Sequence, residues 1–223
     1  EKPHLTALNI RILDSPSLAI EQSSVEILKM GDGCQKMIDW LRTILTQDPP
    51  DKALSERLLR REQVLDDIQD EVAEFITNLL SGNVAHAVAE EARQQIRISD
   101  EFESVSDYIT SILKFDRRLR KDGHRFGPTQ IEQLLQLHDI VADYLSAVNE
   151  ALKQQNQEVL RTLAPAGKNI RNKIKELRAK HLTALSDVKI APPVSVAFMA
   201  TLNAYVRVRD HAQNIAETIA GEK

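Results

Sequence analysis

The chain has 223 residues, of which 29 are basic and 33 are acidic, and its formal net charge is −4. This near balance of charge gives no general attraction to nucleic acid, so we expect no nucleic-acid partner. The only cysteine, Cys34, excludes an intramolecular disulfide framework and a cysteine-rich metal site. No apolar run approaches the roughly 18 to 20 residues that a membrane-spanning helix needs.

The composition favours a protein that is almost entirely helical. Leu, Ile, Ala, Glu, Gln, Arg and Lys are abundant, whereas the chain has seven Gly and eight Pro. Apolar periodicity and helix-end signals predict a lead-in over residues 1–16, followed by six long helices. Their expected ranges are about 17–46, 53–80, 85–119, 129–163, 168–185 and 194–220.

Turn-forming residues divide this series of helices. The segment 116–128, DRRLRKDGHRFGP, is rich in charge and in turn residues, and it predicts two domains, 17–120 and 121–223. A second break, between the fourth and fifth helices, is expected at Pro165-Ala166-Gly167.

The third and sixth helices carry similar text near their ends. SVSDYITSI occupies residues 104–112, and VRVRDHAQNI occupies residues 206–215. A related segment that returns after three helices indicates a tandem repeat of three-helix units. Each unit would bury its apolar stripes against one another, so the predicted fold is all-α with two tandem three-helix bundles.

Four carboxylates form two pairs with helical spacing. Asp66 and Asp70 lie in the second helix, Glu103 and Asp107 lie in the third, and each pair shares one face of its helix. Carboxylate oxygens one turn apart suit a hard cation, which removes their mutual repulsion. These four residues are therefore candidate metal ligands. The alternative is ordinary surface charge, because both pairs lie roughly 140° to 180° around the helix from its apolar stripe.

Other patterns give no support for catalysis. Within the predicted helices the histidines form no H-x-x-x-H or E-x-x-H pair, which argues against a di-metal oxidase centre in a bundle core. The phosphate-binding and dinucleotide-binding glycine motifs are absent, so we expect no organic cofactor. Gly31 and Gly33 indicate close packing or a bend in the first helix, and Cys34 is expected to be a small apolar filler. We name no catalytic residue and predict that the protein is not an enzyme.

Several stretches resemble the PhoU family. IRISDEFESVSDYITSI, residues 96–112, is similar to the third helix of a PhoU repeat, approximately I-R-x-x-x-D-L-E-R-I-G-D-x-x-x-N-I. VRVRDHAQNIAE, residues 206–217, resembles the same helix in the second repeat, and LDDIQDEV, residues 65–72, resembles the (E/D)-x-x-x-D motif of the second helix. The opening text PHLTALNIRILDSPSLAIEQSSVEILKM is similar to the linker and first helix of PhoU-like domains that follow the membrane domain of a sodium/phosphate cotransporter.

This resemblance implies a PhoU-like six-helix architecture and a regulatory role in the control of phosphate uptake. It also implies that the chain, which begins at Glu1 without a methionine, is the cytoplasmic part of a sodium/phosphate cotransporter at the inner face of the cell membrane. The implied partner is the transporter domain of the same polypeptide or a signalling protein, and a homodimer is a further option.

The family further implies a surface metal ion or small metal cluster, with Fe, Zn, Mn and Ni as candidates. By position, Asp66 and Asp70 match the motif of the second helix, and Glu103 and Asp107 match the motif of the third. Two other functions stay open at this point. One is a carboxylate-metal phosphohydrolase that uses the same four residues, and the other is a metal-free helical adaptor.

The second repeat departs from the family pattern. Val206 stands at the glutamate position of the sixth helix, where Asp210 remains, and Asn169 and Asn172 stand at the aspartate positions of the fifth. We therefore expect at most one well-charged metal cluster, in the first repeat.

Overall fold

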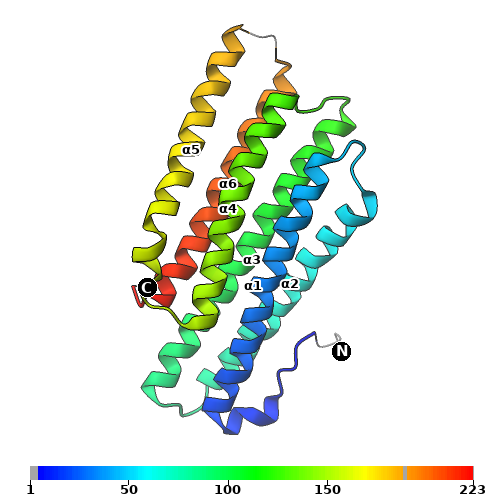
Figure 1. The fold of residues 1–223 in the computed structure, drawn as a ribbon. Coiled ribbons are helices and arrows are strands. Elements are labelled where there is room, and N and C mark those ends of the chain that lie inside the picture. The colour runs from blue at the N-terminus through cyan, green and yellow to red at the C-terminus, as the bar shows by residue number, and fades with distance from the viewer. Residues whose placement is uncertain (1–4, 188–189, 223) are drawn as a thin grey trace.

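The protein is all-α throughout the part of the chain that the structure describes. The computed structural model describes residues 5–187 and 190–222. Its elements are η1 (Ile10–Asp14), α1 (Pro16–Thr46), α2 (Lys52–Leu80), α3 (His86–Lys121), α4 (Pro128–Gln154), α5 (Val159–Asp187) and α6 (Pro192–Ile219) (Figure 1). The predicted fold class is confirmed. Across the described residues, no helix combines the length and the apolarity that a membrane span requires.

The helices form where apolar residues recur every three or four positions and can be buried along one face. The stripe predicted for α3 is buried as expected, and its members are Ile98, Phe102, Val105, Ile109 and Ile112. Polar caps mark some helix starts. At the start of α2, a carboxylate oxygen of Asp51 accepts hydrogen bonds from the backbone N–H groups of Ala53 and Leu54. These bonds satisfy two of the amides that a helix start leaves without partners.

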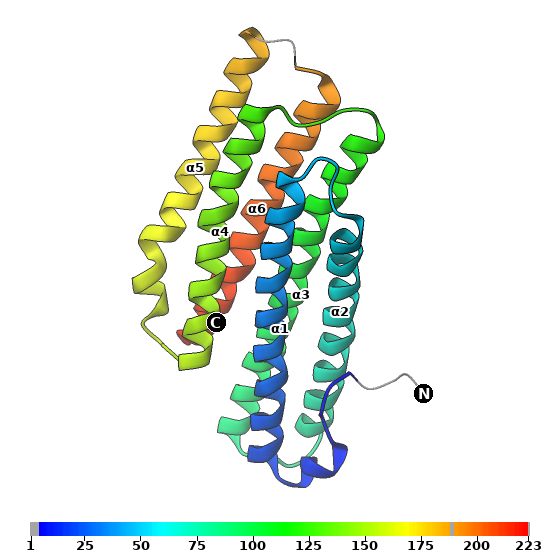
Figure 2. The same ribbon diagram turned by 45° about the vertical axis from the view of Figure 1, so that its right-hand side comes forward.

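The six helices are arranged as two groups of three, α1–α2–α3 and α4–α5–α6, which lie side by side (Figures 1 and 2). In the middle of the molecule, α3 packs against α6 and α1 packs against α4. In both views α2 and α5 lie at opposite edges. One continuous hydrophobic core runs through both groups. The division into domains 17–120 and 121–223 follows the helix order and stays a prediction.

The boundary between the fourth and fifth helices differs from the prediction. The predicted break at Pro165-Ala166-Gly167 is wrong, because α4 already ends at Gln154 and Pro165 lies inside α5. The chain turns at Gln155, which has a left-handed φ of 49°. Pro165 is exposed and lies in the second turn of α5, where it removes one backbone hydrogen bond. In these first turns Val159 is buried, and the partly buried Leu160 and Leu163 pack against the core.

The lead-in packs against the first helical group in the part that the structure describes. The backbone N–H groups of Leu5 and Thr6 donate to the two carboxylate oxygens of Glu71 at 2.9 and 3.1 Å. The Thr6 hydroxyl donates to the same carboxylate at 2.6 Å. The lead-in is therefore bound to α2 before it enters η1.

Candidate metal centre

Three of the four predicted ligands meet where α2 and α3 lie against each other. Asp66 from α2 and Glu103 and Asp107 from α3 each offer one carboxylate oxygen, and these oxygens lie within 4.8 Å of one another. Asp66 and Glu103 are half-buried and Asp107 is exposed. The fourth predicted residue, Asp70, is exposed and does not belong to this group. The group therefore lies at the contact of the two helices and is partly buried, whereas the helical angles predicted a fully outward position.

Glu62 is a fourth carboxylate at this position that the sequence reasoning missed. Burial raises its pKa, and the neighbouring Asp107 raises it further, while Lys114 opposes the change. The Nζ atom of Lys114 lies 4.0 Å from a carboxylate oxygen of Glu62. The signal was present, because Glu62 and Asp66 form an E-x-x-x-D pair one helical turn before the pair that we chose.

Within this group, the negative charge of Asp66 is strongly destabilised by its surroundings. Burial and the nearby carboxylates, first Glu62 and then Asp107 and Glu103, raise its pKa to about 6. Its Oδ1 atom is buried and has no hydrogen-bond partner among the described residues. Burial and Asp107 also raise the pKa of Glu103. A buried carboxylate oxygen without a donor, surrounded by other carboxylates, fits a cation better than it fits water or protein alone.

Two glycines of α1 allow α2 and α3 to pack closely against α1 beside this group. A Cβ atom on Gly33 would lie 2.9 Å from Leu65, the residue before Asp66. A Cβ atom on Gly31 would lie 2.9 Å from Phe102, the residue before Glu103. Both glycines are buried inside an uninterrupted α1. Their role is close packing, which was one of the two roles that the sequence left open.

The two other carboxylates of the same stretch of α3 have partners outside this group. Asp100 accepts a hydrogen bond from the side chain of Gln69 on α2 at 2.7 Å. Glu101 faces α6, where it lies 2.6 Å from the Nδ1 atom of His211 and accepts from the side-chain amide of Asn214 at 3.1 Å. Glu101 thus links the two helical groups, which the sequence pattern did not reveal because its partners lie more than 100 residues away.

The second repeat has no matching acidic group among the described residues. Val206 is half-buried, and Asp210 forms an ion pair at 2.8 Å with Arg209, the residue beside it. Asn169 and Asn172 are exposed on α5. Only the first repeat therefore brings three carboxylates together in the part of the chain that the structure describes.

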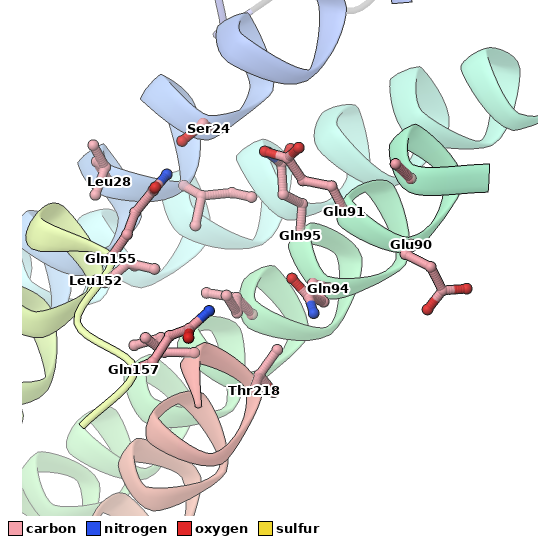
Figure 3. A pocket seen from close by; sticks show the side chains of 14 residues that line it. Ser24, Leu28, Glu90, Glu91, Gln94, Gln95, Leu152, Gln155, Gln157 and Thr218 are labelled. Carbon is pink, nitrogen blue, oxygen red and sulfur yellow. The ribbon is translucent and has the colours of Figure 1, made fainter. Parts of the chain in front are cut away.

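A surface hollow separate from the acidic group lies where α1, α3 and the ends of α4 and α6 meet (Figure 3). Its volume is about 480 Å³, and amide side chains such as Gln94, Gln95 and Gln157 line it together with apolar residues. Glu90 is on its rim and forms an ion pair with Arg93. The lining offers neither a nucleophile with an adjacent base nor a group of metal ligands, so we assign no chemistry to it.

The fold and this acidic group define a class of protein: a helical bundle made of two three-helix units, with clustered carboxylates on the outer face of the first. The family model described as PhoU domain matches residues 27–115, which span α2, most of α1 and α3, and all four clustered carboxylates. This match confirms the resemblance to the PhoU family that the sequence motifs predicted.

Solved structures agree with this fold. The phosphate transport system regulatory protein PhoU from Streptococcus pneumoniae has a TM-score of 0.79 and 15% identity, over 92% of this chain and 95% of that one. PhoU from Pseudomonas aeruginosa has a TM-score of 0.70 and 16% identity, over 89% of this chain and 94% of that one. At these identities the likeness shows a shared fold. No curated protein matches the chain in sequence.

Proposed function

We propose that this chain is a regulatory, non-enzymatic PhoU-like domain that controls phosphate uptake. The observation that carries this proposal is the PhoU domain at residues 27–115, set in a fold that follows PhoU structures over 92% of the chain. One of those structures is named as a phosphate transport system regulatory protein. The opening sequence supports a finer version, in which the chain is the cytoplasmic part of a sodium/phosphate cotransporter and acts on its membrane domain.

The test is phosphate uptake in the source cell. We expect that deleting residues 16–219 from the native protein leaves phosphate import running at high external phosphate, where the intact protein restrains it. Uptake of radiolabelled phosphate measures this difference. Equal uptake with and without the domain, at both low and high phosphate, would contradict the regulatory role.

We also propose that the acidic group binds a divalent or trivalent metal ion. Asp66, Glu103 and Asp107 would be the ligands, with Glu62 beside them, and Asp70 would contribute little. The buried, unpartnered oxygen of Asp66 supports this assignment. The ion would neutralise the clustered charge and fix α2 against α3, which gives it a structural or sensing role.

Metal content separates this proposal from its alternatives. We expect purified protein to retain Mn²⁺, Zn²⁺, Ni²⁺ or iron after exposure to each, and Asp66→Asn and Asp107→Asn to lower the affinity by about tenfold or more. Asp70→Asn and Asp100→Asn are matched controls, because they remove one nearby charge outside the group. Equal loss in Asp70→Asn would make our choice of ligands wrong, and absence of metal from the wild type would favour the metal-free adaptor.

The remaining alternative is a carboxylate-metal phosphohydrolase. We expect no turnover of a generic phosphoester by the Mn²⁺- or iron-loaded protein, because the Ser104 hydroxyl, which donates to Glu103 at 3.2 Å, would have only a metal-bound carboxylate as its base. Turnover that disappears in Asp107→Ala would instead identify the group as an active site.

A further inference from the structure

The second helical group has a hollow between α5 and α6 that is lined by positive charge. Its volume is about 330 Å³. Six residues line it: Arg171, Ile174, Lys175, Arg178, Val206 and Arg209. Four of the six are cationic and none is acidic. Since Val206 occupies the repeat position of Glu103, this hollow is the counterpart of the acidic group in the first repeat, with the sign of its charge reversed.

Arg209 is the fixed element of this hollow. Its side chain is buried, with 8% of its surface exposed. One terminal nitrogen donates to the side chain of Gln213 at 2.8 Å, and the other pairs with Asp210 at 2.8 Å. Its Nε–H group is buried and has no hydrogen-bond partner among the described residues. A buried guanidinium donor without an acceptor is costly, so an incoming acceptor would be stabilised there.

Arg178 repeats this pattern on the facing helix. Its terminal nitrogen donates to the side-chain oxygen of Asn203 on α6, and its Nε–H group is also buried without a partner in the described part of the chain. Arg171 and Lys175 are exposed on the same face of α5. Among the described residues, neither of them forms an ion pair. Two fixed donors at the base and two unpaired cations at the rim therefore face one hollow.

We propose that this hollow binds a phosphoryl-type oxyanion, held by Arg209 and Arg178 and enclosed by Arg171 and Lys175. Tetrahedral oxyanions accept several hydrogen bonds at once, and guanidinium groups match them with directed N–H donors. The carboxylate of Asp210 already pairs with Arg209 and helps to fix its orientation. The inference does not depend on the metal proposal, because α2 and α5 lie at opposite edges of the molecule (Figures 1 and 2).

Two sources of such a group fit the open rim: free inorganic phosphate and the phosphate of an anionic lipid headgroup. The first probe is inorganic phosphate, titrated into the full chain by calorimetry in a phosphate-free buffer containing EDTA. The second probe is a phosphatidylcholine vesicle with and without phosphatidic acid, measured by co-sedimentation. The chelator removes metal from the acidic group, so that phosphate bound to a metal ion does not contribute.

We expect Lys175→Gln, Arg171→Gln and Arg209→Gln each to weaken binding of the effective probe by about tenfold or more. Lys168→Gln is the matched control, because it removes one exposed cation from α5 outside the hollow and should leave binding unchanged. Asp66→Asn should also leave it unchanged. If Arg209→Gln does not fold, the two exposed variants decide the outcome.

Phosphate binding with this pattern of losses identifies the free anion as the ligand, and the same pattern with phosphatidic acid vesicles alone identifies the headgroup. The proposal is overturned if neither probe binds, or if binding is equal in wild type, Lys175→Gln and Arg171→Gln. Loss of binding in Asp66→Asn but not in Lys175→Gln would move the anion to the acidic group.

Discussion

Asp66 shows how the environment of one residue turns a common surface carboxylate into a candidate ligand. Its sequence neighbours Asp67 and Asp70 carry the same charge, yet only Asp66 belongs to the acidic group between α2 and α3. Removing one of its oxygens from water disfavours the charged form, and four nearby carboxylates disfavour it further. A cation reverses both effects, because it replaces the lost hydration and cancels the repulsion.

This pKa shift predicts a pH dependence for the metal-free protein. The carboxyl of Asp66 has a pKa of about 6 in the folded state and its usual value of 3.8 in the unfolded chain. Between these values the folded state binds more protons, so the free energy of unfolding falls as pH rises through that window. We expect Asp66→Asn to flatten this fall, as measured by urea unfolding in EDTA at pH 4, 5, 6 and 7.

Asp70→Asn is the control for this experiment, since Asp70 is exposed on the same helix and outside the group. Its pH profile should run parallel to that of the wild type. Identical slopes for the wild type and Asp66→Asn would show that Asp66 is not held in its protonated form by the fold.

At the scale of an element, two glycines of α1 determine how closely α2 and α3 can approach α1. Gly31 and Gly33 are both buried, and each leaves room for a large side chain of a different helix, Phe102 of α3 and Leu65 of α2 respectively. Between them lies the exposed Asp32, which forms an ion pair with Lys153 of α4 at 2.9 Å. The glycines therefore set the spacing of three helices within one turn of α1.

Gly31→Ala is expected to destabilise the fold. In a helix interior, alanine is more favourable than glycine by about 1 kcal/mol. Forcing an extra methyl group into a packed core, however, costs about 1 to 3 kcal/mol. At Gly31 the new Cβ would also lie 3.0 Å from the Oδ1 atom of Asn149, whose amide is held by its bond to the Gly31 carbonyl. We therefore expect a net loss of about 1 to 2 kcal/mol in the free energy of unfolding.

The measurement is chemical unfolding of Gly31→Ala beside Lys36→Ala, an exposed change on the same helix that should stay within about 0.5 kcal/mol. Gly31→Ala should also lower metal affinity, because Phe102 precedes Glu103 and moves with it. Increased stability in Gly31→Ala would show that the neighbouring helices yield easily.

At the scale of the whole molecule, the contact of α3 with α6 joins the two helical groups. Its centre includes Glu101 with His211 and Asn214, and the ring of Tyr108 stacks on His211 with centroids 5.5 Å apart. The guanidinium carbon of Arg207 lies over the Tyr108 ring, 5.6 Å from its centre. These residues come from the two matching helices of the repeat, so the duplicated unit uses the same helix twice to build its central contact.

Glu101→Ala is expected to weaken this contact. It would leave His211 and Asn214 without the carboxylate that they share, which should lower the free energy of unfolding by about 1 to 3 kcal/mol. The matched control is Glu90→Ala, which removes an exposed α3 carboxylate that pairs with Arg93 and should cost no more than about 0.5 kcal/mol. Equal effects in urea unfolding would show that the Glu101 contact adds nothing to the union of the two groups.

Much of the architecture could be predicted from the sequence, because helical periodicity is a local property. The stripe of α3 and the order of the helices follow from residues that are near one another in the chain. The boundary of α4 and α5 was missed because Pro165 signals a break locally, whereas burial of the residues around it is decided by α4 and α6. Glu62 was missed for a different reason: two overlapping carboxylate pairs on α2 have the same spacing, and only the position of α3 distinguishes them.

By itself, the sequence determined the all-α class, the repeat, the resemblance to the PhoU family and the candidate ligands Asp66, Glu103 and Asp107, since each depends on local spacing along the chain. Only the tertiary structure decided which carboxylates lie close together. Glu62 and Asp70 are each one helical turn from Asp66, and the position of α3 determines which of them is near Asp107. The tertiary structure also gave Glu101 its partners on α6 and brought the cations of α5 and α6 to one hollow. Those contacts join residues that are distant in sequence, and they arise only when the helices pack.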